Sequence, residues 1–202
     1  MRTTTKSSTK SAKSSSASSS SRATSRSRAN VEDAVSILTD DHDKVKKLFK
    51  QFEKHCKAEN EEAKVETANM ICMELTIHAM TEEEIFYPAA RMAIDDDDLL
   101  NEAEVEHDSA KELIAQIQFM EPENPMYDAK VTVLGEYIDH HITEEEEEMF
   151  PKVRKAKVDL EELGEQLMMR KAELMAEMMN DDDEINIEVL KQHALDAVSK
   201  KH

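Results

Sequence analysis

The chain has 202 residues, enough for one domain with extensions, and only two of them are glycine and four are proline. That scarcity, with abundant Ala, Leu, Met, Glu and Lys, predicts an almost wholly helical protein. The net charge is −19, and it is unevenly distributed, because residues 1–30 carry seven Lys/Arg and no acid. The remainder therefore holds 19 basic against 45 acidic side chains, a balance of −26. Such a charge repels nucleic acid and anionic membranes and attracts cations.

In chain order, residues 1–30 are rich in Ser, Thr, Lys and Arg and have almost nothing to bury, so we expect a disordered basic tail. Helical periodicity starts near Val31. It predicts helices over 31–58, 61–87, 98–120 and 126–150, then a further helix over 157–180 and a short one near 187–198.

The breaks between these helices have identifiable causes. Asp95 to Asp98 supply an N-cap for the third helix, and residues 121–125 hold two prolines that interrupt the chain. Pro88 and Pro151 are expected to end or kink the helices they follow. We therefore expect a tail over 1–30, a helical bundle over 31–155 and a C-terminal helical extension over 156–202.

One pattern of histidines and glutamates occurs twice within the bundle. His42 is followed 36 residues later by His78, and His107 is followed 34 residues later by His141. Each second histidine has a glutamate four residues on and a proline ten residues on. The repeated set is His42, His78, Glu82, His107, His141 and Glu145. A duplicated set of four imidazoles and two carboxylates indicates a site for two metal ions.

All six side chains fall within the apolar stripes of their helices. In the first helix, for example, His42 lies between Leu38 and Val45 at steps of four and three residues. Such a stripe faces the core of a bundle, where polar groups are costly unless something satisfies them. Each hairpin also brings its two histidines level, because the midpoints of the pairs fall in the predicted turns, at residues 60 and 124. In each hairpin the histidine pair lies roughly 25 Å from the turn, at a rise of about 1.5 Å per residue.

A metal-free alternative is a buried network in which protonated histidines neutralise the two glutamates. Every lone pair and proton of such a network needs a partner, whereas two divalent cations satisfy all six groups at once. Imidazole and carboxylate ligands without thiolate fit iron, and also Zn or Mn. His55 and His140 also have a glutamate four residues on, and we assign both to solvent-exposed faces.

On these six residues the chain resembles the hemerythrin-like family, the HHE cation-binding domain, over about residues 33–153. The resemblance implies an all-α, up-down-up-down four-helix bundle holding a non-haem di-iron centre bridged by Glu82 and Glu145. Oxygen-carrying members have a fifth terminal histidine where this chain has Lys111, and a ligating aspartate where it has Glu146. Both departures imply an open coordination position and argue against simple oxygen carriage.

The sequence is compatible with three functions. We expect a binding protein whose two iron ions bind or sense O₂, NO or iron, rather than an enzyme. The alternatives are a di-iron oxidase or peroxidase that consumes O₂ or peroxide, and an iron or zinc buffer with no redox role. No residues form an evident substrate pocket or proton relay, so we name no catalytic residue.

Partners and location are expected from composition. Five methionines between residues 168 and 179 indicate an adaptable apolar face that packs on the bundle or on a partner protein. Residues 1–30 can bind nucleic acid only weakly. No apolar run reaches the roughly 18 residues of a membrane span, and there is no apolar core of a secretory signal. Cys56 and Cys72 fit no metal or redox spacing, so we expect reduced thiols in a cytoplasmic protein.

Overall fold

The computed structural model describes Met1 and residues 32–199; the predicted tail, apart from Met1, lies outside the described residues. Within that part of the chain the secondary structure is helical, without a strand. The elements are α1 (Ala34–Lys57), α2 (Glu61–Thr81), η1 (Glu82–Phe86), α3 (Tyr87–Ala93), α4 (Asp97–Gln118), α5 (Tyr127–Glu144), η2 (Glu145–Met149), α6 (Phe150–Lys155), α7 (Leu160–Met178) and α8 (Ile187–Ser199). The prefix η marks a π-helical turn.

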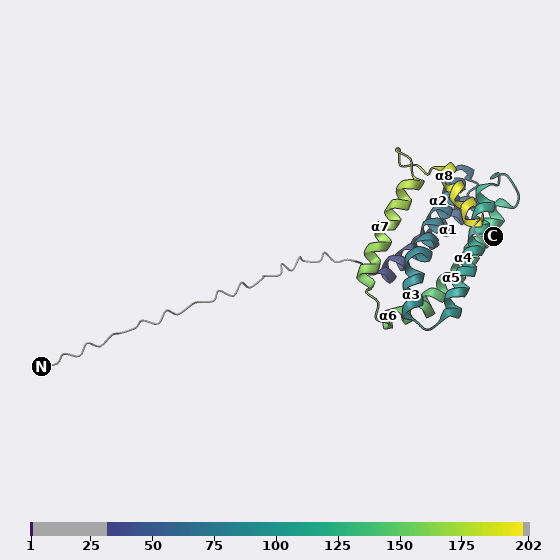
Figure 1. Ribbon diagram of the computed structural model, residues 1–202. Coiled ribbons are helices and arrows are strands. Elements are labelled where there is room, and N and C mark those ends of the chain that lie inside the picture. Colours follow the sequence, from purple (N-terminus) through teal and green to yellow (C-terminus); the bar gives the residue numbers. More distant parts are fainter. Residues whose placement is uncertain (2–31, 200–202) are drawn as a thin grey trace.

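The bundle consists of two helical hairpins, α1 with α2 and α4 with α5, packed side by side as predicted (Figure 1). Side-chain caps fix where its helices begin. The carboxylate of Asp33 accepts from the backbone N–H of Ser36, and Asp96 accepts from Leu99 N–H, as the predicted cap of the third helix requires. These caps set the register in which the apolar stripes meet.

The predicted helix ends at residues 87 and 150 were too early. Helical structure continues past Pro88 to Ala93 and past Pro151 to Lys155, through the π-helical turns η1 and η2. In those turns the N–H of Tyr87 donates to the carbonyl of Glu82, five residues back, and Phe150 N–H donates to Glu145 in the same way. The widened turn leaves each proline in the first turn of a new helix, where its missing N–H costs nothing.

Two apolar clusters fill the bundle and leave a polar layer between them. One cluster contains Val45, Leu75, Ile114 and Ile138. The other contains Leu38, Phe86, Leu100 and Phe150. The buried histidines lie between these clusters, since His42 separates Leu38 from Val45 along α1. The chain therefore places polar groups across the middle of its core.

The C-terminal helices pack on the bundle. α7 lies against α1 and α2 (Figure 1). Its Leu163 and Leu167 belong to the cluster around Phe150, and its Leu174 and Met178 belong to the cluster around Leu75. α7 thus crosses the polar layer from one apolar cluster to the other. α8 packs mainly on α4.

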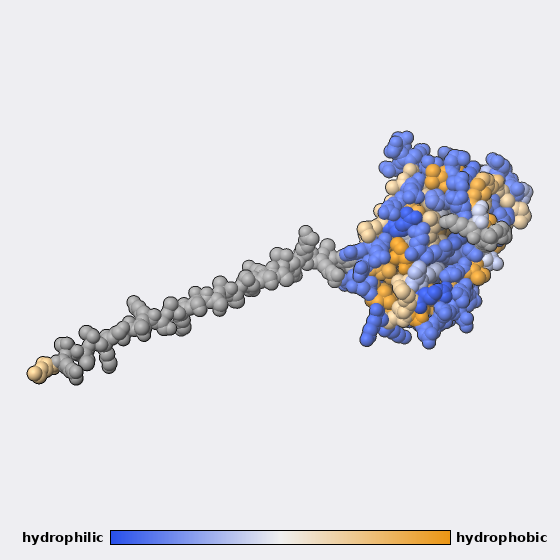
Figure 2. Space-filling view, in the orientation of Figure 1, coloured by the Kyte–Doolittle hydropathy of each residue, from blue (hydrophilic) through white to orange (hydrophobic). Residues whose placement is uncertain are grey.

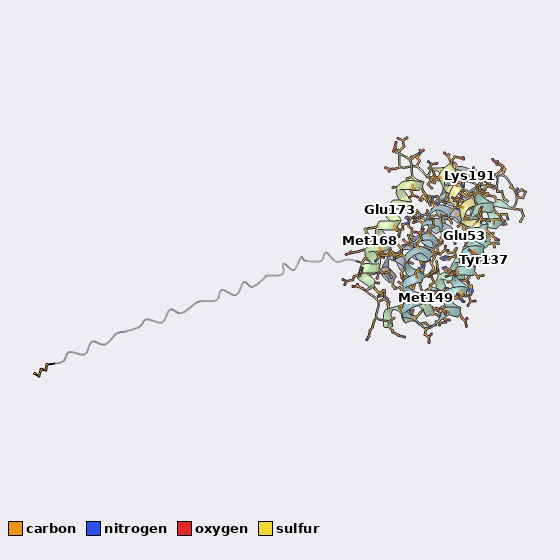
Figure 3. All side chains as sticks on the ribbon, viewed as in Figure 1. Glu53, Tyr137, Met149, Met168, Glu173 and Lys191 are labelled. Atoms are coloured by element: carbon orange, nitrogen blue, oxygen red, sulfur yellow. The ribbon has the colours of Figure 1, made fainter. Side chains whose placement is uncertain are left out.

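The visible surface is mostly hydrophilic, with apolar residues scattered among charged ones (Figure 2). Met168 and Met169 on α7 are exposed, whereas Met178 is buried. Figure 3 labels Met168 and Glu173 on α7 and Tyr137 on α5, toward the opposite edge in that view. Among the described residues, no helix has the length and apolarity that a membrane crossing requires.

Gly164 permits the close approach of α7 to the start of α1. A Cβ atom at this position would lie 2.4 Å from the carbonyl oxygen of Glu32 and 3.1 Å from the backbone N of Ala34. Because these are backbone atoms, we expect Gly164→Ala to destabilise the protein by about 1–3 kcal/mol in chemical denaturation. Gly135→Ala is the matched control, since its Cβ would meet only the Phe49 ring, at 3.1 Å. An equal or larger loss in the Gly135 variant would contradict this account.

Candidate metal centre

The structure brings the six predicted side chains together in the polar layer. The four histidines come from α1, α2, α4 and α5, and the two glutamates begin the π-helical turns η1 and η2. All six are buried, and the most accessible, His78, is 6% exposed. A four-residue spacing from histidine to glutamate keeps each pair on one helix face. The layer therefore holds six potential ligands, three from each hairpin together with the π-helical turn that follows it.

Their ligand atoms form two groups, each within the reach of one metal ion. His42, His78, Glu82 and Glu145 form one group, and Glu82, His107 and His141 form the other, with the atoms of each group within 4.8 Å of one another. In the first, Nε2 of His78 is 3.1 Å from Glu82 Oε2. In the second, Nε2 of His107 is 3.3 Å from the same oxygen. Glu82 is thus common to both groups.

Several of these atoms are in contact without a satisfactory hydrogen bond. His42 Nε2, His78 Nε2, both oxygens of Glu82 and Oε2 of Glu145 are buried without an aligned partner among the described residues. Nevertheless, His42 Nε2 is only 3.2 Å from Glu145 Oε2. Converging lone pairs without aligned protons are expected of metal ligands, and unsatisfied buried polar atoms are otherwise costly. The residues present therefore fit two metal ions.

Four carboxylates outside the ligand set orient the histidines. Each histidine has its Nδ1 next to a carboxylate oxygen, which leaves its Nε2 directed at the centre. The pairs are His42 with Glu146 at 2.9 Å, His78 with Asp41 at 3.5 Å, His107 with Glu83 at 2.9 Å and His141 with Glu106 at 2.8 Å. Such carboxylate contacts fix the ring orientation and raise the basicity of a metal-binding histidine.

These four carboxylates, which the sequence analysis did not identify, occupy equivalent positions in the two repeats. Asp41 and Glu106 each precede the first histidine of a repeat and contact its second histidine. Glu83 and Glu146 each follow a glutamate ligand and contact the first histidine of the other hairpin. Glu146, at the position where the family resemblance placed a ligand, thus serves as an orienting group. The sequence does carry a sign of their role, because each of these acids lies one residue from a ligand at the same place in both repeats.

Each outer carboxylate is in turn paired with a basic group. Lys46 and Lys111, four residues after His42 and His107, pair with Glu146 and Glu83 respectively. Asp41 pairs with Lys171 of α7. Glu106 lies 3.4 Å from His140. The centre therefore has three layers: ligands, carboxylates and basic side chains.

His140 lies where the sequence predicted it, at the surface, beside Glu106 and Glu144. These three residues form a partly exposed group that does not include any of the six ligands. Tyr137, one helical turn before His141, is 48% exposed and is not part of the core. Its helix turns the side chain away from the stripe that carries Ile138 and His141.

Tyr87 is a further residue of the centre that the sequence did not single out. Its hydroxyl donates to Glu145 Oε1 at 2.9 Å and lies 3.2 Å from His107 Nε2. The equivalent residue of the other repeat is Phe150, whose ring stacks on His42 with an interplanar angle of 7°. At this position the two halves of the centre differ by one hydroxyl, which donates a hydrogen bond to a glutamate ligand.

Tyr87→Phe tests this hydroxyl. Without the donor, Glu145 Oε1 loses a buried hydrogen bond, which costs about 1–3 kcal/mol. We expect metal binding to persist with roughly tenfold weaker affinity, measured by competition with a chelator. Tyr127→Phe is the control, because Tyr127 is equally buried in the apolar cluster and far from the ligands in sequence and packing. Equal weakening in both variants would contradict a specific role for Tyr87.

Electrostatics within the layer favour charge on its ligands. Burial lowers the pKa of His78, but Glu82, Asp41 and Glu145 outweigh burial and raise that pKa to about 10. The pKa of His107 rises to about 9 for the same reasons, with Glu82 and Glu83 as the main partners. Burial raises the pKa of Glu82, yet His78 and His107 hold it well below the usual range. Protons and metal ions therefore compete for the same atoms.

A small cavity adjoins the centre on the side of the apolar cluster that contains Leu75 and Ile114. It offers about 20 Å³ to the centre of a water-sized molecule, enough for one such molecule. Asp41, Lys111 and the four histidine ligands border it. Its apolar walls are formed by Val45, Leu75, Ala110, Ile114, Ile138 and Ile142. A space of this size and polarity suits a diatomic molecule.

Comparison with known proteins agrees with this geometry. The sequence model of the hemerythrin HHE cation binding domain matches residues 33–153. A DNA nickase from Nostoc sp. (strain PCC 7120 / SAG 25.82 / UTEX 2576) is 30% identical over 126 residues, which are 62% of this chain and 34% of the relative. The chain thus spans about a third of that relative's length.

The same fold occurs in a solved structure. The crystal structure of a hemerythrin HHE cation binding domain-containing protein from Mycobacterium kansasii superposes with a TM-score of 0.61 at 24% identity. The match covers 72% of this chain and 88% of the other. It confirms the predicted all-α bundle.

Proposed function

This chain belongs to the hemerythrin HHE cation-binding domain family, and we propose that it is a non-haem di-iron protein that binds or senses O₂ or NO. The observation that carries the proposal is the buried layer of six ligands. Five of its ligand atoms lack an aligned hydrogen-bond partner among the described residues: His42 Nε2, His78 Nε2, both oxygens of Glu82 and Oε2 of Glu145. His42 and His78 would hold one ion, His107 and His141 the other. Glu82 would bridge them, because it belongs to both groups.

The ligand set favours iron over softer metals. Imidazole and carboxylate ligands without thiolate suit Fe, and also Zn or Mn. Cys72, although buried, belongs to the apolar cluster around Leu75 rather than to the centre. Bound iron would supply reversible coordination of a small ligand and a change of oxidation state.

The protein's own groups would select the ligand. The aliphatic side chains around the cavity make its walls apolar, and the space of about 20 Å³ that it leaves for the centre of a water-sized molecule favours a ligand of that size. Lys111 borders this cavity and pairs with Glu83, which holds His107. A cation therefore stands beside the space in which a ligand would gain negative charge. The Tyr87 hydroxyl donates its hydrogen bond to Glu145 and not to the cavity.

Sensing is favoured over turnover by the enclosure of the centre. All six ligands are buried and the adjoining space is too small for an organic substrate. The DNA nicking named for the Nostoc relative is disfavoured for this chain, since all six ligands are buried and the residues beyond the first 30 carry a charge balance of −26 that repels phosphates. A signal could pass through α7, where exposed Met168 and Met169 offer a surface to a cytoplasmic protein partner.

Elemental analysis and absorption spectroscopy test the proposal. We expect two irons per chain, and a new near-ultraviolet and visible spectrum when the reduced protein meets O₂ or NO, without consumption of further ligand. Sustained consumption of O₂ or peroxide would favour an oxidase or peroxidase. Two zinc ions with no response to either gas would favour buffering, and no bound metal would overturn the proposal.

A further inference from the structure

Helix α7 lies outside the part of the chain that matches the family, yet it contacts the metal centre's outer layers. Lys171 pairs with Asp41, the carboxylate next to Nδ1 of His78. The adjacent Arg170 binds Glu84 through two nitrogens, at 2.7 and 3.3 Å. Glu84 belongs to the π-helical turn that begins with Glu82. Arg170 thus contacts the turn that carries Glu82, and Lys171 contacts the α1 carboxylate that lies beside His78.

The packing of α7 fixes these two residues at the level of the ligands. Leu167 is fully buried in one apolar cluster and Leu174 in the other. Arg170 and Lys171 lie midway between them, where the polar layer separates the clusters. The two buried leucines fix the backbone of α7 on either side of Arg170 and Lys171, so less conformational freedom is lost when these residues pair than on a free helix. The contact is therefore part of how α7 docks.

A comparison of the two repeats shows that Lys171 of α7 takes the place of a basic residue that the bundle itself supplies in the second repeat. In the second repeat the basic group beside the outer carboxylate Glu106 is His140, the residue before a ligand histidine. Its equivalent in the first repeat is Ile77, which is buried and uncharged. Lys171 of α7 takes that role for Asp41. The other three basic groups come from the bundle itself, and this one alone among the four comes from the extension.

We infer that Lys171 and Arg170 are positioning residues of the metal centre, acting through Asp41 on His78 and through Glu84 on the turn that bears Glu82. The inference rests on the proposed metal-binding function. It makes the occupancy of one half of the centre dependent on α7, and the docking of α7 dependent on metal. The His78–Asp41 contact is the longest of the four contacts between a ligand histidine and an outer carboxylate, at 3.5 Å.

The test uses the full chain loaded with Zn²⁺, a diamagnetic probe. We expect Lys171→Met to weaken one of two bound Zn²⁺ ions by roughly tenfold in chelator competition, the low end for outer-shell partners. By nitrogen-edited NMR, the Nδ1–H signal of His78 should shift or broaden while those of the other three ligands stay in place. Lys171→Arg should restore both readouts. A general loss of stability would not act on one ring alone.

Two further variants complete the design. Arg154→Met is the matched control, because Arg154 also ties the C-terminal part of the bundle to α1, through Asp33 at 3.1 Å, but no ligand contacts that pair. Asp41→Asn removes the same link from the other side, so Lys171→Met should add little to it in a double-mutant cycle.

The outcomes separate the inference from the proposed function. Wild-type protein with two Zn²⁺ ions, and a Lys171→Met variant equal to it in affinity and in the His78 signal, would overturn the role of α7 and leave the metal centre standing. Additive effects of Asp41→Asn and Lys171→Met would also overturn it. Wild-type protein that binds no Zn²⁺ and no iron would overturn both.

Discussion

Glu82→Ala is expected to abolish binding of both metal ions, whereas His78→Ala should remove one ion and leave the other weakly bound. The difference follows from geometry, because Glu82 belongs to both groups of ligands and His78 to one. The measurement is metal per chain by elemental analysis after gel filtration. Each variant also leaves buried imidazoles or carboxylates without a counter-charge.

Thermal stability should fall together with metal content, since the ligands are core residues. A metal present at 100 times its dissociation constant stabilises the folded state by about 2.7 kcal/mol. Loss of that linkage and of the buried side chain predicts a fall of at least about 3 kcal/mol. In a chain of this size that corresponds to a decrease in Tm of roughly 10 °C.

His55→Ala is the matched control for these variants. His55 also has a glutamate four residues on, but its side chain is partly exposed and it belongs to neither ligand group. We expect normal metal content and a Tm within about 1–2 °C of wild type, as for most surface substitutions. Full metal loading of both the Glu82 and the His78 variants would show that the assignment of ligands to the apolar stripe is wrong.

The ligands were predictable because helical geometry is periodic. A histidine at position 42 within a stripe of apolar residues must face the core, and a four-residue step must return to the same face. The two midpoints in the turns then set the hairpins level without any knowledge of their packing. What failed was the path of the chain after each glutamate. Pro88 and Pro151 read as helix ends, but a single π-helical turn relieves the clash and lets the helix continue.

The outer layers were not predictable, for a different reason. Asp41 and Glu106 point sideways, toward a neighbouring helix, so their role depends on interhelical geometry that no periodicity encodes. Acids fill 45 of 202 positions, which hides four meaningful ones. Tyr87 was equally hidden, because its repeat partner is Phe150 and an aromatic residue in a core stripe needs no special role. Nothing in α7 itself indicated which bundle face it covers, so the pairing of Lys171 with Asp41 is known only from the fold.

Removal of the metal with a chelator is expected to release α7 before it loosens the rest of the extension. If Lys171 helps to hold His78, linkage requires that bound metal helps to hold Lys171 by the same free energy. Couplings between sites of this kind are about 1–3 kcal/mol. The amides of α7 between Leu167 and Leu174 should therefore exchange with solvent deuterium about 5- to 150-fold faster in the metal-free protein. Lys171→Met should produce much of that change with metal still bound.

Helix α8 supplies the internal control for this experiment. It follows α7 in the chain but packs mainly on α4, with Leu190 and Ala194 in the apolar cluster rather than beside a ligand. Amides of α8 should change less than those of α7. An equal acceleration in both helices would mean that metal loss loosens the whole fold and that α7 has no preferential coupling. A selective change in α7 would mean that occupancy of a buried centre alters a surface that displays Met168 and Met169, which is what a sensor needs in order to pass its signal to a partner.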